Sequence, residues 1–211
     1  MRDETPSVLI IDDDPKFRDS VARLLRTVGL RTREFSSVSD FLQADPWDGP
    51  TCLVLDVRMP GRSGLELQRD LAAAKRQVPI IFITAHADVP MTVQAMKGGA
   101  MEFLTKPFRD QDLIDAVEAG LARDRARRKS DKALAGLRER FDTLSSRERE
   151  IMLHVMAGRL NKQIAHDIGI AESTVKVHRT NLMRKMKARS LPELSRMADI
   201  LNLMPRQPPS T

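Results

Sequence analysis

Short runs of apolar residues alternate with helical patterns over the first half of the chain. A continuous apolar run predicts a buried strand, whereas apolar residues at intervals of three or four predict an amphipathic helix. The predicted strands are Val8–Ile11, Arg31–Phe35, Cys52–Leu55, Ile80–Ile83 and Glu102–Thr105. The predicted helices are marked by Phe17–Val28, Val38–Gln43, Leu65–Leu71, Val93–Met96 and Asp112–Leu121. Strand–helix units in regular alternation predict an α/β fold, with a parallel sheet and helices on both faces.

The alternation ends after Leu121, where apolar residues become sparse. The following stretch contains the charged run Arg123–Lys129 but no proline, so we expect it to form a helical connector. Within it, apolar residues at helical spacing predict a docking stripe, namely Leu134, Leu137 and Phe141. Later residues have helical patterns throughout, and the proline-rich end is expected to be disordered. The predicted organisation is a first domain at 6–121, a connector at 122–142, a small all-α domain at 143–204 and a disordered tail at 205–211.

The net charge changes sign between the two halves of the chain. Residues 1–120 carry 15 Lys and Arg against 19 Asp and Glu, a net charge of −4. Residues 121–211 carry 20 Lys and Arg against 10 Asp and Glu, a net charge of +10. The acidic half therefore suits a cation site, and the basic half suits a polyanion such as nucleic acid.

The apolar runs are too short for a membrane span. The longest surrounds Ile80–Ile83, whereas a transmembrane helix needs roughly 20 consecutive apolar residues. The polar N-terminus lacks the apolar core of a signal peptide. Cys52 is the only cysteine, which excludes an intrachain disulfide and a zinc framework. We therefore expect a cytoplasmic protein without a membrane partner.

Polar residues stand where the predicted strands end. Asp12–Asp14 follow the first strand, Asp56 follows the third, Thr84 ends the fourth and Lys106 follows the fifth. Because the carboxyl ends of parallel strands share one edge of the sheet, we expect these side chains to converge. Clustered carboxylates need a cation, and ligands that offer only oxygen favour Mg²⁺, with the ammonium of Lys106 as a second counter-charge. Such a site suits phosphoryl transfer onto Asp56, with Thr84 donating a hydrogen bond to a phosphoryl oxygen.

Several residues near these strand ends have a plainer interpretation. Asp14 precedes Pro15, so it is expected to be a helix N-cap. Gly61 and Gly64 are expected to permit turn geometry rather than to touch phosphate. His86 is interpreted as a loop residue rather than a catalytic base.

Four segments of this half together resemble a response-regulator receiver domain, over residues 8–121. They are Ile10–Asp14, Leu55–Gly64, Ile83–Ala85 and Phe103–Phe108. The resemblance implies a doubly wound five-stranded sheet in the order 2-1-3-4-5. It also implies that Asp56 is the phosphoacceptor of a sensor histidine kinase. The implied Mg²⁺ ligands are Asp12, Asp13, Asp56 and the backbone carbonyl of Arg58.

The same resemblance assigns a conformational switch. It implies that Thr84 and Phe103 move together when Asp56 is phosphorylated, although an aromatic residue on a short edge strand is otherwise ordinary packing. It implies that Lys106 binds the phosphoryl group and that its bond to Pro107 is cis.

The pattern of the basic half predicts three helices, which are followed by a last helix near the C-terminal end. Ser145 and Glu148 form the pattern of a capping box, which begins the first. The second begins at Asn161 and ends at Gly169, because glycine readily adopts the left-handed conformation that ends a helix. The third is expected to have Ser173 as its N-cap and to run to about residue 187.

The third helix has two different faces. The inward face is predicted to hold Val175, His178, Leu182 and Met186. A separate polar and basic stripe holds Lys176, Thr180, Arg184 and Lys187. A basic helical face of this width suits the DNA major groove, although a solvated face is the plainer alternative.

Residues 144–203 resemble the helix-turn-helix domain of the LuxR and FixJ group, so the whole chain resembles the FixJ/NarL family. The matching segments are Leu144–Glu150, Ala157–Gly158, Asn161–Ala165, Ile170 and Ser173–Arg179. The implied base contacts are Lys176, Val177 and Thr180. The implied phosphate contacts are Lys162, Thr174, His178 and Arg179, and Arg184 completes the DNA-binding set. Residues 185–192 and the last helix resemble FixJ in particular, with an implied dimer contact through Leu191, Leu194, Met197, Ala198 and Leu201. Simple core packing is the plainer interpretation of these residues, and the two roles can coexist.

These features predict a DNA-binding transcription regulator rather than an enzyme. We expect phosphorylation to promote homodimerisation and binding to double-stranded promoter DNA, where RNA polymerase is a further partner. One alternative is a Mg²⁺-dependent phosphohydrolase, but such enzymes commonly place a second Asp two residues after the nucleophile, where this chain has Arg58. Another is a phosphorylated adaptor that binds protein or RNA, which the helix-turn-helix pattern disfavours.

Overall fold

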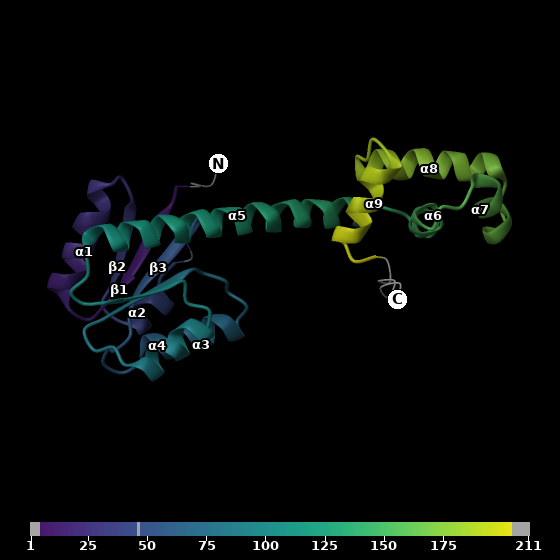
Figure 1. Ribbon diagram of the computed structural model, residues 1–211. Helices are drawn as coiled ribbons and strands as arrows, with labels where there is room; N and C mark the ends of the chain where they lie inside the picture. Colours follow the sequence, from purple (N-terminus) through teal and green to yellow (C-terminus); the bar gives the residue numbers. More distant parts are fainter. Residues whose placement is uncertain (1–4, 46, 204–211) are drawn as a thin grey trace. The chain divides into compact units, whose positions relative to one another are not determined.

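The computed structural model describes residues 5–45 and 47–203, and it divides into two compact units (Figure 1). The division falls between Arg128 and Lys129, within the predicted connector at 122–142. The predicted tail at 205–211 lies outside the described residues. Within the described ranges, none of the helices is long and apolar enough to cross a membrane.

The first unit contains the predicted parallel sheet. Its strands are β1 (Ser7–Ile11), β2 (Arg31–Phe35), β3 (Thr51–Asp56), β4 (Ile80–Thr84) and β5 (Glu102–Thr105). They lie in the order β2-β1-β3-β4-β5 and every pair is parallel, which confirms the expected topology. All the strands therefore end at the same edge of the sheet.

Helices cover both faces of this sheet, as Figure 1 shows. One face packs against α1 (Pro15–Thr27) and the first turns of α5 (Asp110–Asp142). The other packs against α2 (Val38–Gln43), α3 (Gly64–Ala73) and α4 (Val89–Lys97). Val28 was expected on the buried stripe of α1, but it is 44% exposed because the helix ends at Thr27 and Val28 is its C-cap.

Local sequence signals position the loops at the sheet edge. Asp14 is the N-cap of α1, as predicted, and its side chain accepts from the backbone N–H of Lys16. Gly61 adopts a φ of 81°, which suits the expected turn role. Gly64 has a different role from the one predicted: it begins α3, and a Cβ there would overlap the backbone carbonyl of Asp56. The bond between Lys106 and Pro107 is cis.

Helix α5 continues through the whole of the predicted connector. Asp124 on this helix is only 1% exposed, although it lies in the charged run. Its carboxylate accepts from the backbone N–H of Thr51 at 2.9 Å and forms ion pairs with Arg127 and Arg128. In the second unit, Leu137 of the predicted docking stripe is buried in the core.

The second unit is helical and has its own core. It contains α6 (Ser146–Met156), α7 (Asn161–Ile168), α8 (Glu172–Met186) and α9 (Leu191–Ile200). The capping box at Ser145 and the left-handed Gly169, with a φ of 68°, confirm two predicted helix boundaries. The fully buried centre of the unit includes Ile151, Ile164, Val175 and Leu194.

The predicted start of α8 is wrong by two residues. Ala171 is the N-cap, not Ser173, and no side chain caps this end of the helix. The backbone carbonyl of Ala171 already accepts from the N–H groups of Thr174 and Val175. The first turn of α8 therefore begins at Glu172, with the buried Val175 in it, and has no side-chain cap.

Candidate functional site

The sheet brings three predicted site residues together. Asp12 follows β1, Asp56 is the last residue of β3 and Lys106 follows β5. The Nζ atom of Lys106 donates to Oδ2 of Asp12 at 2.7 Å and lies 3.7 Å from Oδ1 of Asp56. Asp12 and Lys106 are 94 positions apart in sequence, so only the topology of the sheet explains this contact.

The carboxylate of Asp56 is buried, and its neighbours neutralise its negative charge only in part. Asp56 is 8% exposed, and the backbone N–H of Arg58 donates to its Oδ2 atom at 3.2 Å. Burial raises the pKa of Asp56 to about 6, and repulsion by Asp12 and Asp13 acts in the same direction, while Lys106 and the Arg58 N–H oppose it. Negative charge on Asp56 is therefore costly until a further cation arrives.

Other predicted residues lie around these three. Thr84 is 1% exposed at the end of β4, and its hydroxyl oxygen accepts from the backbone N–H of His86 at 3.3 Å. His86 itself is exposed. Phe103 on β5 is half-buried, with its ring centroid 6.2 Å from that of Phe82 in the core. The side chain of Asp13 is exposed beside the site.

The donor set is chemically suited to Mg²⁺. Asp12, Asp13, Asp56 and the carbonyl of Arg58 offer only oxygen atoms, and Mg²⁺ prefers oxygen and usually retains several waters. The described part of the chain contains no cluster of three or more acidic, His or Cys side chains already arranged around a metal position. Here Asp12 is instead paired with Lys106. The oxygen chemistry of these residues fits the ion, although Asp12 would have to exchange its contact with Lys106 to bind it.

Lys106 also has a neighbour that the sequence interpretation assigned only to the core. Its Nζ atom lies 3.5 Å from the centroid of the Phe17 ring, on α1. The ring of Phe108 packs against Phe17 at 6.2 Å with an interplanar angle of 88°. Helical spacing predicts that Phe17 packs inward, but it contains no signal for a contact with a lysine 89 positions later.

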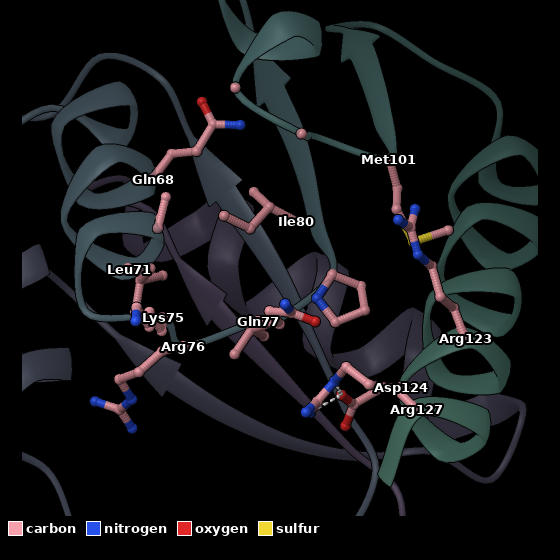
Figure 2. Close-up of a pocket in the computed structure, with 15 residues that line it drawn as sticks. Gln68, Leu71, Lys75, Arg76, Gln77, Ile80, Met101, Arg123, Asp124 and Arg127 are labelled. Carbon is pink, nitrogen blue, oxygen red and sulfur yellow. Dashed lines mark hydrogen bonds and ion pairs between the residues drawn. The ribbon is translucent and has the colours of Figure 1, made fainter. Parts of the chain in front are cut away.

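A cavity of about 600 Å³ lies away from the acidic site (Figure 2). It is lined by Ile80, the first residue of β4, whereas Thr84 at the other end of that strand belongs to the site. Figure 2 shows Arg123 beside Met101 on one wall, with the ion pair of Arg127 and Asp124 below it. The cavity is therefore separate from the cluster of Asp12, Asp56 and Lys106.

The second unit exposes most of the predicted DNA contacts. Lys162 on α7 is exposed, and so are the predicted contacts Thr174, Lys176, Val177, Thr180 and Arg184 on α8. His178 is half-buried, in keeping with its predicted inward direction. Arg179 is also half-buried, and its Nη1 donates to Oδ1 of Asn161 at 2.5 Å, joining α8 to the start of α7. The hydroxyl of Thr180 donates to the carbonyl of Lys176 at 3.0 Å.

Comparison with known proteins agrees with both units. The response regulator receiver domain family matches residues 8–118, and the luxR family of bacterial regulatory proteins matches residues 142–198. Nodulation protein W of Bradyrhizobium diazoefficiens is 50% identical over 196 residues, which cover 93% of this chain and 86% of that protein. Transcriptional regulatory protein FixJ of Rhizobium meliloti is 44% identical over 192 residues, covering 91% of this chain and 94% of that one.

Two solved structures are similar over nearly the full chain. The response regulator StyR has a TM-score of 0.87 at 46% identity and covers 92% of this chain and 98% of its own. Full-length FixJ from B. japonicum has a TM-score of 0.56 at 38% identity and covers 97% of this chain and all of its own. The chain therefore belongs to the two-component response regulators that join a receiver domain to a LuxR-type helix-turn-helix DNA-binding domain, with FixJ among its relatives.

Proposed function

We propose that phosphorylation of Asp56 by a sensor histidine kinase controls dimerisation of this regulator and its binding to promoter DNA. The family is one of regulators with a kinase partner and a DNA-binding domain, not of turnover enzymes. The observation that supports the proposal most strongly is the convergence of Asp12, Asp56 and Lys106 at one edge of the sheet.

The chemistry follows from the charges at this edge. An oxygen of Asp56 attacks the phosphorus of a phosphohistidine, an O–P bond forms, and the P–N bond to the kinase breaks. The receiver promotes this step itself, because Lys106 lies 3.7 Å from Asp56 and neutralises charge on the transferring group. Thr84 then donates its hydroxyl hydrogen to a phosphoryl oxygen. Asp56 must be ionised to attack, which its raised pKa still allows at neutral pH.

A magnesium ion is part of the proposed reaction. Asp12, Asp13, Asp56 and the backbone carbonyl of Arg58 would hold it, and it supplies charge neutralisation for the phosphoryl group. The all-oxygen donor set supports this assignment.

The switch reaches the surface through α4 and β5. When Thr84 turns toward the phosphoryl group, Phe103 moves inward beside Phe82, and the segment Val89–Thr105 becomes competent to dimerise. Large apolar side chains on α4 are already exposed, with Val89 at 77%, Val93 at 44% and Met96 at 43%. Converting such a switch from mostly inactive to mostly active requires about 5 kcal/mol of differential stabilisation.

DNA binding is assigned to the exposed face of α8. Lys176, Val177 and Thr180 contact bases in the major groove, while phosphate contacts come from Lys162, Thr174, His178 and Arg179. Arg184 completes the DNA-binding set. A dimer then occupies two half-sites about one helical turn apart. On α9, Leu194 and Ala198 of the implied dimer contact are fully buried in the core of the second unit, so that part of the expectation is wrong. Leu191 is 44% exposed and supports a dimer contact on DNA. A promoter-bound dimer would contact RNA polymerase.

Labelling with radioactive acetyl phosphate in the presence of Mg²⁺ tests the phosphoacceptor. Wild-type protein is expected to incorporate phosphate, and Asp56→Asn is expected to incorporate none, because an amide oxygen does not replace the carboxylate nucleophile. Asp19→Asn on the exposed surface of α1 is the matched control and should label normally. Stoichiometric labelling of Asp56→Asn would refute the assignment.

A DNA-binding assay tests the second half of the proposal. Genomic fragments bound by the phosphorylated protein should contain paired half-sites, and the same protein without phosphate should bind them more weakly. Binding that shows no preference among duplex sequences would contradict the proposed function of α8.

A further inference from the structure

The ammonium group of Lys106 has an aromatic neighbour as well as its acidic ones. Its Nζ atom is 2.7 Å from Asp12, 3.7 Å from Asp56 and 3.5 Å from the centroid of the Phe17 ring. These neighbours come from the ends of β1 and β3 and from the first turn of α1. A lysine side chain is long and flexible, so its ammonium occupies a single position only when several neighbours hold it.

The Phe17 ring is itself held in place. Its apolar body packs against the core cluster between α1, α5 and the sheet. Phe108 packs perpendicular to it, with an interplanar angle of 88°. The orientation of the ring therefore depends on packing with these neighbours rather than on the lysine.

A ring face holds a cation without adding negative charge. A third carboxylate in the same place would also attract Lys106, but it would repel the incoming phosphoryl group, which is itself anionic. The electrons of a ring face attract an ammonium within about 6 Å of the centroid, and the lysine keeps its full charge. An aliphatic side chain of similar size would fill the space but would not attract the cation.

We propose that Phe17 is a positioning residue for phosphoryl transfer: its ring holds the Lys106 ammonium beside Asp56, ready to neutralise the transferring group. This inference rests on the proposed function of Asp56. Phe17 acts through Lys106 and does not touch the reacting atoms. The gain comes from placing the charge in advance, so that little reorganisation is needed when the phosphoryl group arrives.

Fluorinated phenylalanines test this inference with little change of shape. Each ring fluorine withdraws electrons from the ring face and weakens its attraction for a cation. Phe17 is replaced by phenylalanines with one, two and three ring fluorines, and the rate constant of labelling by acetyl phosphate is measured with Mg²⁺ present. The rate constant is expected to fall stepwise along the series, by roughly three- to tenfold in total. The affinity for beryllofluoride, which occupies the same position without reaction, should fall in parallel.

Phe41 provides the matched control position. It is 2% exposed and contacts the rings of Phe35 and Trp47, and among the described residues no Lys or Arg lies over its ring. The same fluorinated series at Phe41 should leave the labelling rate unchanged. Phe17→Leu should label as slowly as the trifluorinated protein, whereas Phe17→Tyr, which keeps a ring face, should retain most of the rate.

The outcomes separate this inference from the proposed function. If wild-type protein labels at Asp56 but the rate does not fall with added fluorine, Phe17 is only a core residue and the inference is wrong. If wild-type protein does not label at Asp56 at all, the proposed function itself fails. A lower melting temperature of Phe17→Leu without a trend in the fluorinated series also indicates packing alone.

Discussion

The acidic edge of the sheet and the basic face of α8 differ in how far the chain neutralises their charge. At the sheet edge, Asp12 and Asp56 are almost fully buried and share the ammonium of Lys106. On α8, Lys176 and Arg184 are exposed, and within the described residues neither forms an ion pair with an acidic side chain. Covalent chemistry needs charges held in place and shielded from water, whereas binding to a polyanion needs accessible positive charge.

A second contrast lies between Asp56, the proposed phosphoacceptor, and two buried carboxylates with more complete sets of partners. Asp124 in the first unit and Glu148 in the second are 1% and 3% exposed. Burial alone would raise the pKa of Glu148, but hydrogen bonds from Lys185 and from the backbone and side chain of Ser145 lower it below its usual value. The pKa of Asp56 is instead raised. The partners of Glu148 stabilise its charge, whereas Asp56 has too few partners to do so, which agrees with its proposed role as phosphoacceptor.

Removing the carboxylate of Asp124 should have the largest effect on stability. Asp124→Ala leaves the backbone N–H of Thr51 without this acceptor and removes one ion pair each from Arg127 and Arg128. We expect the free energy of unfolding to fall by about 4 kcal/mol. Urea unfolding followed by the fluorescence of Trp47, the only tryptophan, measures this unit specifically.

Glu118→Ala is the matched control for that change. Glu118 lies on the exposed side of the same helix, so its replacement should alter stability by no more than about 0.5 kcal/mol. Equal stability of the two variants would mean that Asp124 does not anchor α5 to β3.

Replacing Asp56 should change the free energy of unfolding in the opposite direction. Burial raises the pKa of Asp56 in the folded protein to about 6, above its ordinary value of 3.8, so its ionisation opposes folding at neutral pH. The protonated form of Asp56 stabilises the folded state fully at pH values below the unfolded pKa. This stabilisation is lost as the pH rises through the folded pKa. Asp56→Asn should therefore raise the free energy of unfolding by about 3 kcal/mol at about pH 7, and by about half of that at about pH 5. Urea unfolding in Mg²⁺-free buffer checks both values.

The second unit supplies the comparison for this pH dependence. The lowered pKa of Glu148 means that its ionised form stabilises the fold above its usual pKa, and that this contribution is lost as pH falls. Glu148→Gln should therefore destabilise the protein at neutral pH, where Asp56→Asn stabilises it. Changes of the same sign for both variants would contradict the contrast between Glu148 and Asp56.

The sequence predicted what depends on topology and periodicity. The convergence of Asp12, Asp56 and Lys106 follows once alternating strands and helices imply a parallel sheet. The exposed stripe of Lys176 and Arg184 follows from helical spacing. In each case the spacing along the chain specifies the arrangement before any side-chain packing is known.

Features that depend on particular side-chain contacts could not be predicted in this way. Asp124 lies in a run of charges that looks solvated, and its burial depends on how α5 meets the first residue of β3. The contact of Phe17 with Lys106 depends on the packing of Phe108, and α8 begins two residues early without a side-chain cap for the sequence to reveal. Gly64 looked like a turn residue, but the close approach of the Asp56 carbonyl is what requires it.

The smallest effect should come from one exposed charge on the basic face. Arg184→Gln removes one cation from α8, so the salt dependence of binding to a specific duplex should decrease by about one unit of logarithmic slope. Arg196→Gln removes the same charge from the exposed surface of α9 and should leave the slope nearly unchanged. Fluorescence anisotropy over a range of KCl concentrations measures both slopes. Equal slopes for the two variants would show that positive charge acts over the whole second unit, and that α8 has no special exposure to phosphate.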